Sequence, residues 1–315
     1  MRVIDFHCDA LYKMLNDGNL AFENGRPGVL DVTYERLRGS DALLQVFAVF
    51  ISSDRPDHGT IHPILESVDL LYEKVLACPD MRLILTVSDL EECIQDGKTG
   101  ALLSLEGIDG LRGSLSALRN LYRLGVRAAG FTWNHANWAA DGVMEPRGGG
   151  LTALGKIFVR ECNELGIVVD VSHLSERAFW DMAALSSKPI IASHSNARSV
   201  CDHPRNLTDL QIRAIVEGKG RIGITYVPAF VHSSGNAAIS NLIAHIEHIC
   251  ELGGERHLML GSDFDGIDKH VQGLTHPGQV YALIEELLKR YSQEQTEAFV
   301  YGNALSFLRG QLPLH

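Results

Sequence analysis

Residues that can bind a metal ion follow several apolar segments of this chain. The first apolar segment, residues 2–6, runs into His7-Cys8-Asp9. Successive side chains of a strand point to opposite faces, so His7 and Asp9 should leave the strand end on one side and Cys8 on the other. A His-x-Asp pair alone equally fits a hydrogen-bonded pair that closes the strand. Further residues of ligand type end other apolar segments: Glu106, His173, His194 and Asp263.

The apolar segments alternate with helical patterns along the chain. We expect strands at residues 2–6, 43–51, 101–105, 126–132, 167–171, 189–193, 221–226 and 257–262. We expect helices at about 60–77, 115–124, 151–165, 175–186, 208–218, 236–252, 277–291 and 293–308. Near-continuous apolar runs such as 167–169 suit parallel strands buried on both faces. The alternation therefore predicts a parallel α/β fold.

About eight strand–helix units in 315 residues favour a closed (β/α)8 barrel of the TIM type, forming one domain over residues 1–315. The segment 53–100 is longer than one unit requires and holds an extra candidate strand at 82–86. We expect this segment to form an excursion from the barrel.

The expected barrel would bring the candidate ligands together. Catalytic groups of such barrels lie where the strands end and lead into helices. Glu106 would end the third strand, His173 the fifth, His194 the sixth and Asp263 the eighth. Each has an ordinary structural alternative, such as a turn for Asp263 and Asp265. Five strand ends with such side chains predict a metal site at one rim.

Composition narrows the classes of partner. Lys and Arg number 28 against 39 Asp and Glu, a net charge of −11, which argues against nucleic acid or an anionic membrane surface as a partner. No segment reaches the roughly 18 apolar residues of a membrane span. Six scattered cysteines without a C-x-x-C pair predict free thiols in a reducing cytoplasm and no cysteine zinc site.

An ordered set of blocks resembles the membrane (renal) dipeptidases and their bacterial relatives, among the amidohydrolase-like metal barrels. The resemblance runs from His7 to at least Gly266. Its blocks are Asp5-Phe6-His7-Cys8-Asp9, Glu106-Gly107, Leu118 with Tyr122, Gly125-Val126-Arg127 and Thr132, Asp170-Val171-Ser172-His173, Ser193-His194-Ser195, Pro204-Arg205-Asn206-Leu207 and Gly261-Ser262-Asp263-Phe264-Asp265-Gly266.

The resemblance implies a zinc-dependent dipeptidase with two zinc ions bridged by Glu106. One ion would be held by His7 and Asp9, and the other by His173 and His194. Zinc lowers the pKa of bound water to about 7, so a metal-bridging hydroxide would be the nucleophile, although other divalent metals also suit imidazole and carboxylate ligands. The resemblance also implies a homodimer and tolerance of a C-terminal D-residue.

Two further roles follow from the resemblance. Asp263 would act as the acid and base, and Arg205 would hold the terminal carboxylate of a dipeptide. A guanidinium meets a carboxylate through two parallel hydrogen bonds, which is a physical reason for an arginine here. The structural alternative for Arg205 is a contact with Asp209 at the start of a helix.

The chain departs from the family pattern at two positions. The family places a substrate-binding histidine directly after the threonine equivalent to Thr132, where this chain has Trp133. His135 follows two residues later and is our candidate for that role. Ile108 stands where the signature prefers a small residue, which should alter packing or pocket shape.

Two rival functions stay open. Another metal-barrel hydrolase, such as a deaminase, a cyclic amidase or a phosphoesterase, usually carries His-x-His on the first strand, where this chain has His7 and Asp9. Many related enzymes also bridge their metals with a carboxylated lysine in place of Glu106. A catalytically inactive peptide-binding barrel is the second rival, and the presence of Asp263 argues against it.

Overall fold

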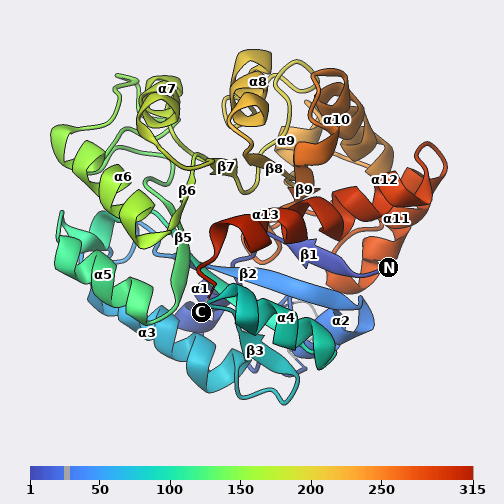
Figure 1. Ribbon diagram of the computed structural model, residues 1–315, viewed down its shortest axis with the longest axis horizontal. Helices are drawn as coiled ribbons and strands as arrows, with labels where there is room; N and C mark the ends of the chain where they lie inside the picture. Colours follow the sequence, from blue (N-terminus) through green and yellow to red (C-terminus); the bar gives the residue numbers. More distant parts are fainter. Residues whose placement is uncertain (25–28, 315) are drawn as a thin grey trace.

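Parallel strands form a closed ring that helices surround (Figure 1). The computed structural model describes residues 1–24 and 29–314, so residues 25–28 and 315 of the expected domain lie outside the described part. The strands are β1 (Val3–Asp5), β2 (Ala42–Phe50), β3 (Met81–Leu83), β4 (Thr99–Glu106), β5 (Val126–Gly130), β6 (Val168–Asp170), β7 (Ile191–Ala192), β8 (Arg221–Ile224) and β9 (Leu258–Leu260).

The order of the nine-stranded sheet is β2-β1-β9-β8-β7-β6-β5-β4-β3, and an additional pairing of β2 with β4 closes the ring. Strand β3 pairs with the first residues of β4, from Met81 opposite Thr99, and stands outside the ring. The other eight strands form the barrel, which confirms the predicted (β/α)8 fold. Register places Phe50 opposite Glu106 where β2 and β4 end.

The helices cover the outside of the ring. They are α1 (Ala10–Asn16), α2 (Tyr34–Gly39), α3 (His62–Leu70), α4 (Val87–Gln95), α5 (Leu115–Arg123), α6 (Ala153–Leu165), α7 (Glu176–Leu185), α8 (Asp209–Glu217), α9 (Pro228–Val231), α10 (Ile239–Glu251), α11 (Val280–Leu288), α12 (Gln293–Glu297) and α13 (Asn303–Gln311). Short 3-10 turns lie at Asp109–Leu111, Glu255–His257 and Pro277–Gln279, and π-helical turns at Leu71–Val75 and Ala298–Gly302.

Side-chain caps fix where helices begin after the strands. Ser175 accepts a hydrogen bond from Ala178 N at the start of α7, two residues after His173. Thr208 and Gln211 form a reciprocal capping box at the start of α8. Such caps satisfy backbone N–H groups that have no partner within the helix. They leave short links between strand and helix, and these links carry the candidate ligands.

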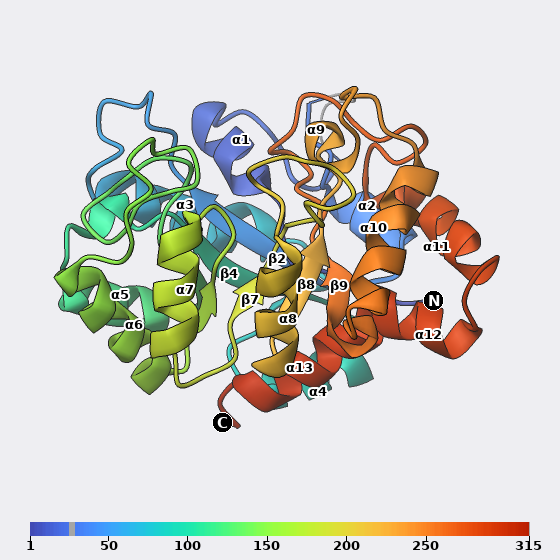
Figure 2. The ribbon, with the colours of Figure 1, turned by 90° about the horizontal axis from the view of Figure 1, so that it is seen from above.

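Two apolar layers hold the barrel. Alternate residues of a strand belong to different layers. Leu102 lies in the layer that includes Phe307 of α13, whereas Leu103 lies in the layer beneath the outer helices. Figure 2 shows α13 at one end of the barrel and α1 and α9 at the other. Helix α13 therefore closes the end where the strands begin, and the end with the candidate ligands stays free for a site.

The segment between β2 and β4 is long. It holds α3, the π-helical turn Leu71–Val75, β3 and α4. Thr86 and Asp89 form a capping box at the start of α4, and Leu90 and Cys93 of that helix are buried. The candidate strand at 82–86 corresponds to β3 at Met81–Leu83. Strand β3 of this segment stands outside the closed ring, whereas the residues just after β2, including Ser53 and His58, line a hollow beside Trp133.

Candidate metal centre

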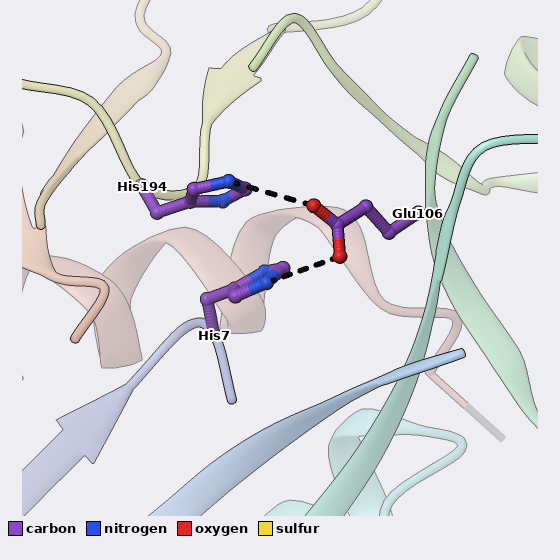
Figure 3. A group of neighbouring side chains, drawn as sticks. All are labelled: His7, Glu106 and His194. Carbon is purple, nitrogen blue, oxygen red and sulfur yellow. Dashed lines mark ion pairs between the residues drawn. The ribbon is translucent and has the colours of Figure 1, made fainter. Parts of the chain in front are cut away.

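Five of the predicted ligands meet at the carboxyl ends of the strands. The Oε2 atom of Glu106 lies 3.4 Å from His7 Nε2, and its Oε1 atom lies 2.9 Å from His173 Nε2 and 3.7 Å from His194 Nε2. Asp9 Oδ2 lies 3.4 Å from His7 Nε2. Figure 3 shows His7 and His194 facing different oxygens of Glu106. The two oxygens of the carboxylate therefore face two adjoining groups of ligand atoms, one with His7 and Asp9 and the other with His173 and His194.

Asp263 joins the first of these groups. Its Oδ1 lies 3.8 Å from His7 Nε2. His7, Asp9 and Asp263 offer ligand atoms that all lie within 4.8 Å of one another, as do His7, Glu106 and His194. Imidazole nitrogens and carboxylate oxygens without thiolates form a donor set that zinc and several other divalent metals accept.

Most of these ligands lie just beyond their strands. Strand β1 ends at Asp5, two residues before His7, although extended backbone continues because Cys8 N donates to Val46 O. Glu106 is the last residue of β4. His173 and Asp263 each have a left-handed backbone, with φ of 69° and 68°. Non-glycine residues rarely adopt this conformation, and such strain is concentrated at functional sites.

Unpartnered buried atoms support the presence of a cation. Among the described residues, His7 Nε2 and Asp9 Oδ1 are buried without a hydrogen-bond partner. His173 Nε2 and His194 Nε2 face each other at 2.8 Å. Leaving such polar atoms without a partner costs about 1–3 kcal/mol each. Bound metal would satisfy His7 Nε2 and Asp9 Oδ1 and would lie within reach of His173 Nε2 and His194 Nε2, so the residues fit the metal that the sequence predicts.

Hydrogen bonds fix the tautomers of His173 and His194. Asn134 Oδ1 lies 2.9 Å from His173 Nδ1 and accepts its hydrogen. Ser193 Oγ donates to Asp170 Oδ2 and therefore accepts from His194 Nδ1, at 2.7 Å. Both rings then carry their proton on Nδ1 and turn a lone pair on Nε2 toward the centre. Metal-binding histidines are commonly held in this way.

Burial and charge set the protonation of the metal-free cluster. Burial lowers the pKa of His173 to about 4, and the charge of Arg205 acts in the same direction. Burial alone would raise the pKa of Glu106, but the charge of His7 and the close approach of His173 and His7 outweigh it and leave that pKa well below its usual range. Burial raises the pKa of Asp263, and the charge of His7 opposes this rise. Glu106 is therefore an anion and His173 a neutral imidazole at neutral pH.

A cavity of about 170 Å³ opens beside the cluster. Its polar lining includes Asp9, Glu106, His173, Arg205 and Asp263. Two larger hollows, of about 530 and 390 Å³, lie against Arg221 and Phe22 and contain none of the candidate ligands. The smaller cavity is the one that adjoins the chemistry.

Arg205 faces this cavity. Its guanidinium donates to His194 O at 3.2 Å and lies 5.4 Å from the ring of Phe230. The residue is 4% exposed, and its Nε has no hydrogen-bond partner among the described residues. The structural alternative is wrong, because Asp209 instead pairs with His248 and Ser199.

The loop after β5 differs from the expectation. Trp133 and Asn134 line the cavity, whereas His135 lines a neighbouring hollow of about 100 Å³ that also touches Trp133. His135 is thus outside the cavity lining within the described part of the chain. The chain turns back on itself after Asn134, because Met144 N donates a hydrogen bond to Asn134 O and Gly142 N donates one to His135 O. This path of the loop turns His135 away from the cavity. Ile108 is buried, 1% exposed, and takes no part in the lining.

Three supporting residues escaped the sequence reasoning. Asp5 accepts hydrogen bonds from His7 N and Ser262 N, and so ties β1 to β9. Asp170 does the same for Ser172 N and Ser193 N between β6 and β7. Each is a carboxylate in an otherwise apolar strand, two or three residues before a ligand, and that pattern was the available signal. Asn134 had no such signal, because its role depends on the fold of its loop.

Asp265 holds a neighbouring loop. It accepts hydrogen bonds from Asp31 N at 2.7 Å and Val32 N at 2.9 Å, and Lys13 Nζ lies 3.2 Å away. Burial raises the pKa of Asp265 to about 6, with Asp31 acting in the same direction and Lys13 opposing it. Asp265 therefore supports the turn that carries Asp263 and is not a ligand.

The sequence profile of the membrane dipeptidases (peptidase family M19) matches residues 1–311. The chain belongs to the membrane dipeptidase family. This is a family of metallo-dipeptidases, and a dipeptidase from Claviceps purpurea, tcpJ, is 32% identical to this member over 262 residues, 82% of the chain and 62% of that protein's length. The dipeptidase aclJ of Aspergillus oryzae is 31% identical over 291 residues, 88% of the chain and 69% of that protein.

The structures of membrane dipeptidases agree with this fold. A metallopeptidase of Rhodobacter sphaeroides, liganded with a phosphinate mimic of the dipeptide L-Ala-D-Ala, superposes with a TM-score of 0.90 over 99% of both chains at 26% identity. Among the described residues of the present family member, no helix has the length and apolar character needed to cross a membrane.

Proposed function

We propose that this protein hydrolyses dipeptides with a free C-terminal carboxylate at a binuclear zinc site. The observation that carries the proposal is the position of Glu106, whose two oxygens face His7 on one side and His173 with His194 on the other. A single carboxylate placed between two sets of ligands is suited to bridge two ions. The family membership supports the peptide substrate.

The proposed ligands divide into two sets. His7 and Asp9 would hold one zinc ion, and His173 and His194 the other, with Glu106 shared. Bound zinc would polarise the peptide carbonyl and make hydroxide available as a nucleophile near neutral pH. The hydrogen bonds that His173 and His194 donate to Asn134 and Ser193 keep the two histidine rings oriented for this role.

Asp263 is proposed to move the proton. Its side chain is 14% exposed toward the cavity, and its Oδ1 lies 3.8 Å from His7 Nε2. The carboxylate would take a proton from the attacking water and give it to the nitrogen of the leaving amine. Burial raises the pKa of Asp263, and this favours the first step, because a more basic carboxylate takes the proton more readily.

Arg205 is proposed to bind the terminal carboxylate. A buried guanidinium that lines the cavity and has an unpartnered Nε favours an anionic group of the substrate. The requirement for that group would restrict the enzyme to short peptides, because a longer chain has no carboxylate at this distance from the scissile bond. His135 remains a predicted substrate contact, with its side chain in the adjacent hollow.

Three further properties belong to this proposal. The Rhodobacter sphaeroides neighbour holds a mimic of L-Ala-D-Ala, which supports acceptance of a C-terminal D-residue here. Six unpaired cysteines support a reducing, cytoplasmic environment. The family resemblance supports a homodimer, which sedimentation would test.

Arg205→Ala tests the carboxylate clamp. We expect a rise of about 10–100-fold in KM for L-Ala-L-Ala and L-Ala-D-Ala, since a charge-assisted pair contributes about 1.5–3 kcal/mol. Zinc content, measured by elemental analysis, should stay at the wild-type value. The measurement is steady-state hydrolysis by zinc-loaded enzyme, with C-amidated dipeptides as the control substrates.

The wild-type protein should release amino acids from free dipeptides but not from amidated ones, and a chelator should stop the reaction. Equal rates with amidated dipeptides, or an unchanged KM in Arg205→Ala, would contradict the clamp. Two bound metals without turnover of any dipeptide would instead favour another amide, ester or phosphoester as the substrate.

A further inference from the structure

The walls of the cavity contain two apolar surfaces, one that reaches His173 and one that adjoins Arg205. Tyr12, Phe50 and Trp133 form a row: the ring centroids of Tyr12 and Phe50 lie 5.1 Å apart, and those of Phe50 and Trp133 also lie 5.1 Å apart. We call these three residues the aromatic row. Trp133 continues toward His173, with centroids 6.2 Å apart. The row therefore reaches the metal ligands.

The second surface adjoins the proposed carboxylate clamp. Val227 and Phe230 line the cavity, and Phe230 stacks near the guanidinium of Arg205. A substrate whose terminal carboxylate meets Arg205 would place the Cα of its second residue beside these two side chains. The first residue, on the other side of the scissile bond, is then left with the aromatic row.

Charge is distributed unevenly in the cavity. Within the described residues, Arg205 is the one Lys or Arg in the lining, and the carboxylates are Asp9, Glu106 and Asp263, which all belong to the metal cluster. A carboxylate side chain on the aromatic row would thus lose water without gaining a partner, and a lysine ammonium would gain only a cation–π contact with the rings in place of its water. Burying an unpaired charge is strongly unfavourable, whereas an apolar side chain gains about 25 cal/mol per Å² that it buries.

We propose that the aromatic row is the subsite for the N-terminal side chain of the dipeptide and selects uncharged, apolar side chains. This inference rests on the proposed dipeptidase function and adds the class of substrate to it. Trp133 determines this selectivity, because its broad apolar ring extends the row to the reaction centre. It stands where the family pattern has a histidine. All three residues of the row are part-buried, so they can be replaced without opening the core.

The test compares two series of dipeptides with the zinc-loaded enzyme. In the first, X-Ala, X is Ala, Leu, Phe, Lys or Glu; in the second, Ala-X, the same residues occupy the C-terminal position. We expect kcat/KM for Leu-Ala and Phe-Ala to exceed that for Lys-Ala and Glu-Ala by about 100-fold, the effect of one unpaired buried charge. Hydrolysis of Lys-Ala or Glu-Ala as fast as Leu-Ala would overturn the proposal.

Trp133→Ala tests which side chain of the dipeptide lies on the aromatic row. In this variant, kcat/KM for Phe-Ala relative to Ala-Ala should fall about tenfold, because the phenyl side chain loses an aromatic contact and the apolar area buried with it. The value of kcat/KM for Ala-Phe relative to Ala-Ala should stay unchanged. Phe230→Ala should change the second ratio and spare the first. Trp180→Ala, on α7 and 38% exposed, is the matched control and should change neither.

Ratios within one variant cancel any general loss of activity or folding. A Trp133→Ala variant that alters the Ala-X series instead of the X-Ala series would refute the subsite assignment. No hydrolysis of any dipeptide by wild-type enzyme with both metals bound would refute the dipeptidase proposal itself, and this inference with it. If the enzyme hydrolyses dipeptides but kcat/KM is the same for every X-Ala substrate, only the subsite proposal is refuted.

Discussion

At the scale of single residues, the cluster can form only if the backbone at one glycine comes close to its carboxylates. Gly266 lies against both carboxylates of the first ligand group: a Cβ added there would stand 2.3 Å from Asp9 Oδ2 and 2.6 Å from Asp263 Oδ1. Contacts this short force the neighbouring atoms to move. The Asp-Phe-Asp-Gly sequence thus provides an acid, a loop support and the room that the acids need.

Gly266→Ala should therefore weaken metal binding. We expect the variant to lose one of its metal ions during dialysis, because Asp9 and Asp263 must both shift, and to lose most of its activity. Elemental analysis after dialysis measures this. Gly310→Ala, in α13 where an added Cβ meets nothing within 4 Å, is the control and should keep both metals. Full metal content in Gly266→Ala would show that the carboxylates can relax without cost.

The relay from Asp170 through Ser193 to His194 offers a second residue-scale prediction. Ser193→Ala removes the group that accepts the His194 Nδ1 hydrogen, so the ring loses its fixed orientation. Zinc affinity should fall about 10–100-fold, the usual effect of losing such a support. Competition with a chelator measures it. The zinc affinity of Asp170→Asn should fall similarly. The double variant should lose less affinity than the sum of the two single losses, because both residues act on the ring of His194. Additive losses would show that the two residues act separately.

At the scale of elements, the loop that carries Arg205 depends on a buried histidine of α10. His245 Nδ1 accepts a hydrogen bond from Ala197 N at 3.1 Å, and its Nε2 donates to Val231 O at 3.0 Å. The residue is fully buried, so it connects the loop after β7 with α9 and α10 as a neutral ring. Its part in the fold is structural.

Burial lowers the pKa of His245 from 6.5 to about 4. A histidine with a depressed folded pKa favours folding above its unfolded pKa, and this contribution is lost as the pH falls from about 6.5 toward 4. The total loss would be about 3 kcal/mol. Urea unfolding of metal-free protein at pH 7, 5.5 and 4.5 measures it, with His245→Gln as the comparison.

The variant keeps a donor and an acceptor but cannot titrate, so the difference in unfolding free energy between it and the wild type should shrink in acid. Comparison of the two proteins cancels the titration of His173, His194 and the carboxylates, which they share. A difference that stays constant from pH 7 to 4.5 would mean that His245 titrates alike in the folded and unfolded chains.

At the scale of the whole molecule, metal binding and folding are linked. The ligands come from β1, β4, β6, β7 and β9, so they assemble only when the ring is closed. His173 Nε2 and His194 Nε2 lie 2.8 Å apart, close enough for one cation to contact both.

Zinc should therefore stabilise the protein strongly. At a free concentration 100 times the dissociation constant, each site adds about 2.7 kcal/mol to the free energy of unfolding. Calorimetry with zinc and with a chelator measures the shift in Tm. Glu106→Gln is the matched variant, since it keeps the volume but removes the shared charge, and its shift should be smaller. An equal shift in both proteins would contradict the bridging role of Glu106.

The sequence by itself determined the barrel and the ligand types. Apolar runs between helical patterns are a local property, and the chemistry of a parallel barrel must follow the strand ends, so His7, Glu106, His173, His194 and Asp263 could be recognised before their contacts were known. The sequence also indicated β3, within one residue of its actual start.

Tertiary structure alone decided the supporting residues and the cavity. Asn134 supports His173, and His135 turns away, because hydrogen bonds from residues 142 and 144 fix the path of that loop. The aromatic row joins side chains from α1, the end of β2 and the loop after β5, which closure of the ring brings together. Strand patterns depend on neighbours along the chain, whereas loop paths and cavity walls depend on contacts between distant segments, and these exist only in the folded barrel.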